Sequence, residues 1–337
     1  MAGHRDADDR RLRIGSGEVT ELAEPLPGIP TAKQRHRVLG YTVYSIAALL
    51  FAVNGTVSKS ILLTGISAAR LTELRVTLAF LIMLIIVAIT RRSALRIRRD
   101  EIALLLAFGI LGVAMTQWLF FFAIERLAVG VALIIEFTAP IMVALWFRFG
   151  RKQPVRPTVW VGLILALVGL TLVAQAWQGF SLDALGAAAA FGAAAALAVY
   201  YILAEHQVHR PNGRDTISLT MWGFGVAALF FAIVQPWWTY PWEDLTGSGQ
   251  PLGVDGPQVP VSALIAWMVI LGTVAPFWLV IASLHHLTSA QASTIGMMEP
   301  VLASIVAWLA LSEILTPVQI IGGLVVLAGV YIAERSR

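Results

Sequence analysis

Apolar residues occur along this chain in long solid blocks, separated by short polar segments. About 20 mostly apolar residues suffice for a helix to cross the hydrocarbon core of a membrane. Membrane strands would instead show segments of about ten residues with alternating polarity. The pattern therefore predicts an all-α polytopic membrane protein with ten transmembrane helices. These cover roughly 38–58, 67–90, 101–123, 128–148, 157–176, 182–204, 215–235, 261–284, 288–309 and 317–333.

Residues 1–37 differ from the rest, because they are polar, mixed in charge and rich in proline and glycine. They lack the apolar region that a cleavable signal peptide needs. We expect a disordered cytoplasmic tail, with the first apolar block acting as both start signal and first span.

Composition narrows the class of protein further. Hydrophobic residues make up 58% of the 337 residues and charged residues 13%, against roughly 25% charged in soluble domains. The net charge of +4 is spread in short clusters between apolar blocks, which argues against a nucleic-acid partner. The chain has no cysteine, which excludes disulfides, thiolate metal sites and cysteine nucleophiles.

The positions of the basic residues predict an orientation, because cytoplasmic loops of membrane proteins carry an excess of Lys and Arg. Of the 24 Lys and Arg residues, 20 lie in the N-terminal tail, the even-numbered loops and the C-terminus. The opposite loops hold only Lys59 and Arg126, and Arg70 and Arg75 lie within the second span. Both termini are predicted to be cytoplasmic, in a multi-pass protein of the cell (inner) membrane.

The chain also matches itself without gaps when Pro140 is laid over Pro300. Trp118 then meets Trp278, and glycines and leucines coincide as well. This self-alignment maps spans 3–5 onto spans 8–10, so each unit has five spans and the two units cross the membrane in opposite senses. We therefore predict two inverted five-helix repeats, at 38–176 and 182–334, an arrangement that recurs in secondary transporters.

Several segments carry a family resemblance. They are "FAVNGTVSKSIL" (51–62), "RLTELRVTLAFL" (70–81), "AIERLAVGVALIIEFTAPIMVALW" (123–146) and "LHHLTSAQASTIGMMEPVLASIVAWLALSEILTPVQIIGGLVVLAGVYI" (284–332). With them the chain, over about 38–334, resembles the drug/metabolite transporter superfamily of the ten-helix EamA type. It departs from that pattern at Ser312, where the family commonly has glycine.

The resemblance implies export of small organic solutes from the cytoplasm, amino acids and related metabolites being typical and drugs being handled by some members. The stretch "EFTAP" resembles the branch that includes threonine and homoserine exporters. An exporter of this kind needs a small-molecule substrate and a lipid bilayer as partners. No cofactor is predicted, and the absence of a GxxxxGK[ST] phosphate loop argues against ATP as the direct energy source.

Two glutamates lie near the middle of their spans, Glu136 in span 4 and Glu299 in span 9. A charged residue at the membrane centre costs on the order of 2.5–3.5 kcal/mol, so such residues usually face a cavity or a partner. Each carboxyl is a candidate for binding a substrate amine or a coupling proton. The alternative is a carboxyl that only braces neighbouring helices.

Two prolines follow these glutamates, and each removes one backbone hydrogen bond. Pro140 and Pro300 are candidates for a gating or cavity role, the alternative being a static kink. Arg75 needs an acidic or carbonyl partner. A structural contact with such a partner is the alternative to a role in substrate binding. The other candidate cavity residues are polar, aromatic or small: Asn54, Gln117, Trp118, Tyr200, Tyr201, Trp278 and Gly296.

Two glycine pairs, Gly162/Gly169 and Gly322/Gly329, are each spaced by seven residues, or two helical turns. We expect close helix contacts there, either between the repeats or with a second copy in a homodimer. The histidines of the cytoplasmic helix ends have no clustered carboxylates, so no metal site is predicted.

Two other functions compete with a transporter working by alternating access. A flippase for lipid-linked substrates would use the same scaffold with a cavity open sideways to lipid. An intramembrane enzyme would need a nucleophile and base or paired aspartates within the spans, and no Asp or His lies deep in any span.

Overall fold

The computed structural model describes residues 32–62, 64–124, 126–127, 129–177, 183–211, 213–245, 248–249, 258–311 and 315–336. Residues 1–31 of the predicted tail, and Ser312, lie outside these ranges. Residues 37–337 form one unit, and of Met1–His36 only the start of the first helix is described. That helix begins at Ala32, within the segment expected to be a tail, because "AKQRHR" consists largely of good helix formers.

Within the described ranges, every regular element in the first half of the chain is a helix. Its elements are α1 (Ala32–Leu62), α2 (Ala68–Thr90), η1 (Arg92–Leu95), η2 (Arg99–Glu101), α3 (Ile102–Ala107), η3 (Phe108–Ala114), α4 (Met115–Ile124), α5 (Val129–Glu136), α6 (Ala139–Leu145), η4 (Trp146–Gly150) and α7 (Pro157–Val173). The segments η3 and η4 are π-helical and continue the α-helices before them.

The second half contains helices and one short antiparallel strand pair. Its elements are α8 (Ala184–His209), α9 (Thr216–Val234), η5 (Trp237–Thr239), η6 (Trp242–Leu245), β1 (Ser248–Gly249), β2 (Val259–Pro260), α10 (Val261–Val269), η7 (Ile270–Val274, π-helical), α11 (Ala275–Ser283), α12 (Ser289–Gly296), α13 (Glu299–Leu311) and α14 (Pro317–Arg335). The strands pair Ser248 with Pro260 and Gly249 with Val259.

Eight helical runs in the described residues are long and apolar enough to cross a membrane. Two of the ten predicted spans fall short of that measure. The fifth is α7, an apolar helix of 17 residues, or about 26 Å at 1.5 Å per residue. The ninth, covered by α12 and α13, is not among these eight runs. The chain is a multi-pass membrane protein, and the count of ten spans stays a prediction.

Polar side chains fix where several of these helices begin. Asp183 and Asp215 accept hydrogen bonds from the backbone amides three residues ahead, at the starts of α8 and α9. Thr288 and Thr316 do the same for α12 and α14, where a glutamine three residues on completes a capping box. Such caps satisfy amides that have no partner inside the helix.

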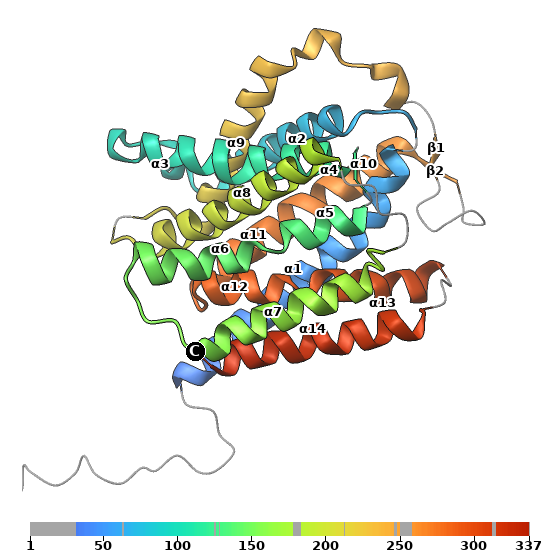
Figure 1. The fold of residues 1–337 in the computed structure, drawn as a ribbon. Helices are drawn as coiled ribbons and strands as arrows, with labels where there is room; N and C mark the ends of the chain where they lie inside the picture. The colour runs from blue at the N-terminus through green and yellow to red at the C-terminus, as the bar shows by residue number, and fades with distance from the viewer. Residues whose placement is uncertain are drawn as a thin grey trace, which may run out of the picture. The chain divides into compact units, whose positions relative to one another are not determined.

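Helices α7 and α14 lie side by side, and their glycines form the contact (Figure 1). A side chain at Gly169 would lie 2.8 Å from the carbonyl oxygen of Gly322, and one at Gly162 would lie 2.6 Å from that of Gly329. Small residues let two helix backbones approach this closely. The prediction of close contact between the two halves at these glycines is therefore confirmed, whereas the homodimer stays a prediction.

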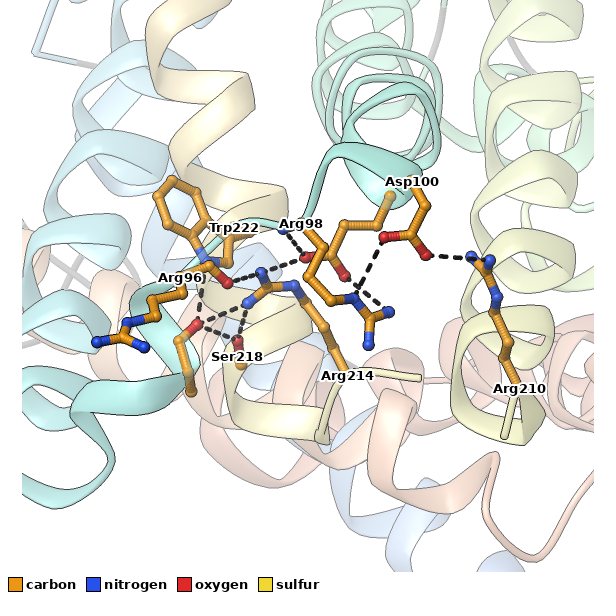
Figure 2. A network of polar contacts seen from close by, with 9 residues as sticks. Arg96, Arg98, Asp100, Arg210, Arg214, Ser218 and Trp222 are labelled. Carbon is orange, nitrogen blue, oxygen red and sulfur yellow. Dashed lines mark hydrogen bonds and ion pairs between the residues drawn. The ribbon is translucent and has the colours of Figure 1, made fainter. Parts of the chain in front are cut away.

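The loop between α2 and α3 is joined to the loop between α8 and α9 by a polar network (Figure 2). Arg214 donates to Glu101 Oε1 at 2.6 Å, to the Ala94 carbonyl at 2.6 Å and to the Arg96 carbonyl. Arg210 pairs with Asp100 at 3.3 Å. The side chains of Arg214 and Glu101 are buried, so the network ties the two loops together away from solvent.

Candidate functional site

Two helix breaks define the candidate site. Helix α5 ends at Glu136 and α6 begins at Ala139, while α12 ends at Gly296 and α13 begins at Glu299. The two breaks coincide in the alignment that lays the first half of the sequence over the second. At each break one amide bonds three residues back, from Thr138 to Ile135 at 3.0 Å and from Met298 to Ile295 at 2.9 Å.

The predicted prolines stand directly after these breaks. Pro140 and Pro300 are each the second residue of the helix that follows, α6 and α13. A proline in the first helical turn sacrifices no internal hydrogen bond and has a backbone dihedral suited to starting a helix. The prolines therefore restart interrupted helices here, rather than kink continuous ones.

The breaks bring together the two predicted glutamates. Glu136 is the last residue of α5 and is buried, and Glu299 is the first residue of α13 and is partly buried. The two carboxylates are close enough to act on each other electrostatically, and Arg75 is close enough to attract Glu299. Neither carboxylate has a hydrogen bond within the described part of the chain.

Arg75 projects from α2 to the π-helical segment η7. Its Nε donates to Thr273 Oγ1 at 2.6 Å, and Nη2 donates to the Gly272 carbonyl at 3.2 Å. A guanidinium has five N–H donors, so these two hydrogen bonds orient Arg75 and leave other N–H donors for further contacts. The expected carbonyl partner is present, together with a hydroxyl that was not expected.

A pair of phenols lies close to Glu299. Tyr44 of α1 and Tyr201 of α8 share a hydrogen bond, and both lie within electrostatic reach of Glu299. Gly296 faces them, since a side chain there would lie 2.8 Å from Tyr44 Oη and 3.3 Å from Tyr201 Oη. Only glycine leaves room for this pair beside the end of α12.

Asn54 completes the cluster from α1. Its carboxamide occupies the space into which a side chain at Gly272 would project. Asn54 Oδ1 is buried and has no hydrogen-bond partner among the described residues. The same holds for the hydroxyl of Tyr200, whose ring packs against Tyr201 and Phe277. A buried polar atom without a partner is costly unless a ligand or water satisfies it.

Among the described residues, no hydrogen bond or ring contact joins the remaining predicted residues to this cluster. Gln117 is buried and bonds within its own helix, to the Val113 carbonyl at 3.5 Å. Trp118 packs against Phe230 and Phe231. Trp278 is 39% exposed on the surface of the unit, where a lipid-facing side chain belongs.

Sequence reasoning missed Tyr44, Gly272 and Thr273. The last two stand together in an apolar run, "VILGTVAPF" (269–277), and a buried threonine next to glycine is a weak signal. Nothing in the sequence marks Tyr44 as a site residue, because a tyrosine within a membrane helix is common.

A cavity of about 220 Å³ lies beside the break that precedes Pro300. It is bounded by α5, the end of α7, the first half of α13 and the beginning of α14. Its lining is mainly apolar and includes Gly130, Leu133, Ile134, Leu170, Val173, Ala174, Pro300, Ala303, Ser304, Leu315 and Gln319. Pro300 is shared between this cavity and the segment that carries Glu299.

One solved crystal structure resembles this chain with a TM-score of 0.70. It shares 16% sequence identity, and the match covers 89% of this chain and 97% of the other. At that identity the likeness concerns the fold alone.

Relatives with higher sequence identity indicate the family of this chain more directly than the structural match does. The threonine/homoserine exporter RhtA of Escherichia coli (strain K12) is 30% identical over 76% of this chain and 78% of its own length. RhtA of Salmonella typhimurium (strain SL1344) is 31% identical over the same shares. The uncharacterized transporter YdfC of Bacillus subtilis (strain 168) is 24% identical over 80% of this chain and 82% of its own.

A family model also matches, over residues 38–175 and 184–334, and its description is the EamA-like transporter family. The relatives are named as transporters and not as enzymes. The chain belongs to the EamA-like transporter family, within the drug/metabolite transporter superfamily.

Proposed function

We propose that this protein exports small amino-acid-like solutes from the cytoplasm by alternating access, with the cluster around Glu136, Glu299 and Arg75 as its central site. The observation that carries the proposal is the pair of carboxylates at two equivalent helix breaks. Interrupted helices near the membrane midplane are where secondary transporters bind substrate. Ionisable residues at that depth are usually functional.

The charges of the cluster suit a zwitterion. The two carboxylates attract an ammonium group, and the unused donors of Arg75 match a carboxylate. Asn54 Oδ1 and the Tyr200 hydroxyl add polar atoms that have no hydrogen-bond partner among the described residues. The threonine/homoserine exporter RhtA at 30% identity supports an amino acid as the solute.

The matching element bounds support two inverted five-helix repeats. When the two halves are aligned on their prolines, α5 corresponds to α12, the start of α6 to the start of α13, and Pro157 of α7 to Pro317 of α14. Such repeats rock against each other around a fixed site. We propose that both termini are cytoplasmic, as the basic residues indicate.

The proposal is tested by efflux of threonine and homoserine from loaded cells and vesicles. Replacing Glu136 or Glu299 by glutamine removes the charge but keeps the size. We expect efflux to fall by about tenfold or more, because a hydrogen bond to a charged group contributes roughly 1.5–3 kcal/mol.

The matched control is Glu243→Gln, which changes an exposed carboxylate in η6 and should leave efflux unchanged. Retained efflux and retained pH dependence in both site variants would remove the glutamates from the mechanism. Absence of efflux of either amino acid by the native protein would contradict the proposed substrate.

A further inference from the structure

The two half-helices that end at the breaks are packed very differently. All eight residues of α12 are buried. In its counterpart α5, only Ala132 and Glu136 are buried among the described side chains of Gly130–Glu136. The 220 Å³ cavity runs along α5, whereas no residue of α12 lines it. Equivalent elements thus differ in their surroundings, since α12 is enclosed and α5 lies beside the cavity.

One carboxylate holds the first turn of α12 against α8. The hydroxyl of Ser289 donates to Glu205 Oε2 at 2.7 Å, and Arg151 pairs with the same oxygen at 3.5 Å. Ser289 and Glu205 are both buried. A charge-assisted hydrogen bond with a buried donor and a paired carboxylate is a strong tie between two helices.

A second carboxylate holds the same turn against α1 and α14. The side-chain amide nitrogen of Gln291, Nε2, donates to Tyr41 Oη at 3.0 Å and to Glu334 Oε2 at 3.3 Å. Tyr41 itself donates to Glu334 at 2.7 Å. The amide oxygen of Gln291 meanwhile accepts from the Thr288 backbone at 3.1 Å, so one side chain both caps α12 and anchors it.

The two contacts, named here the Glu205 clamp and the Glu334 clamp, lie at one end of the unit. Both hold the first turn of α12, and their partners lie in the early part of α1 and near the ends of α8 and α14, on the side predicted to be cytoplasmic. The cavity lies at the other end, where α5 and α14 begin and α7 ends. The clamped side and the cavity are therefore on opposite faces of the membrane.

We propose that α12 is the cytoplasmic gate of the transporter, held shut by the Glu205 and Glu334 clamps, and that the cavity beside α5 opens to the outside. This inference rests on the proposed export function. Glu205 and Glu334 act as positioning residues, because they set the position of the half-helix that leads to Glu299. Opening toward the cytoplasm requires both clamps to release α12, and the cavity beside α5 to close.

The absence of cysteine from the chain makes thiol labelling a direct test. Ser293→Cys places a thiol of similar size in α12, where the serine hydroxyl bonds only within its own helix. Ala303→Cys places one in the cavity. A membrane-impermeant thiol reagent is applied to inside-out or right-side-out vesicles. We expect Ala303→Cys to react from outside and Ser293→Cys to be protected from inside.

Removing a clamp should reverse this pattern. In the Ser293→Cys background, Glu205→Ala should speed labelling from inside by about tenfold, the factor that a lost charge-assisted hydrogen bond corresponds to. In the Ala303→Cys background it should slow labelling from outside. Ser289→Ala removes the same hydrogen bond with a small change, which keeps the test valid if Glu205→Ala does not fold.

Asp100→Asn is the matched control, because Asp100 pairs with Arg210 at 3.3 Å at the same end but does not contact α12. It should change neither rate. Unchanged labelling of Ser293→Cys after Glu205→Ala would overturn the gate. Faster labelling at both positions would also overturn it, because that result indicates a general loosening of the protein. Labelling needs no substrate, so a gate that behaves as expected without amino-acid efflux would overturn the proposed function alone.

Discussion

At the scale of single residues, the sequence identified the charged members of the cluster but not their arrangement. Glu136 and Glu299 stand out because carboxylates are rare at membrane depth. They are not equivalent in the repeat, since aligning the two halves pairs Glu136 with Gly296 and Glu299 with Ala139. At the first break, Glu136 comes before the turn. At the second break, Glu299 comes after the turn, and Gly296, which comes before it, faces the two phenols.

Gly296 provides a prediction at this scale. Gly296→Ala places a methyl group 2.8 Å from Tyr44 Oη, which pushes apart the two phenols beside Glu299. Overpacking of this kind costs about 1–3 kcal/mol, and we expect efflux to fall between about 5- and 150-fold. Adding Tyr44→Phe removes the nearest oxygen and should restore part of the efflux.

The control for this substitution is Gly55→Ala. A side chain at Gly55 of α1 meets nothing within 4 Å, so efflux should remain at the native level. Equal losses in Gly296→Ala with and without Tyr44→Phe would show that the phenol contact is not the cause.

At the scale of elements, the periodicity predicted long helices and the structure divides two of them. The apolar blocks of spans 4 and 9 give no sign of the turns at 137–138 and 297–298, because a two-residue turn leaves the hydrophobic pattern intact. The prolines alone hinted at an interruption. Non-helical backbone at membrane depth is tolerated only where protein or a cavity surrounds it, and that surrounding is a tertiary property.

The contact between α7 and α14 yields a prediction with a control on the same helix. A side chain at Gly322 would lie 2.7 Å from the backbone nitrogen of Val173, whereas one at Gly323 meets only Val301 Cγ1 at 3.4 Å. We expect Gly322→Ala to lower the free energy of unfolding by about 1–3 kcal/mol. Gly323→Ala should be neutral or slightly stabilising, since alanine favours helices.

Thermal unfolding in detergent measures both variants. Gly322→Ala should lower the melting temperature by a few degrees relative to Gly323→Ala. Equal melting temperatures would show that α7 and α14 are not held by close backbone contact.

At the scale of the whole molecule, the distribution of basic residues predicts that Arg335 and the clamps face the cytoplasm, and that Trp238 faces outside. Trp238 is 84% exposed and Arg335 is also exposed. In the cysteine-free chain, Arg335→Cys should react with an impermeant thiol reagent only in inside-out vesicles, and Trp238→Cys only in right-side-out vesicles. The opposite result would reverse the orientation.

The sequence by itself determined the membrane class, the approximate spans, the expected orientation and the family, because all of these depend on local composition, spacing or motifs. The close contact at the glycine pairs was also predictable, since glycines two turns apart lie on one helix face. Only the tertiary structure decided which side chains meet. The Arg75–Thr273 and Tyr44–Tyr201 hydrogen bonds and the two clamps on α12 join residues between 43 and 293 positions apart, and no local pattern encodes contacts over such distances.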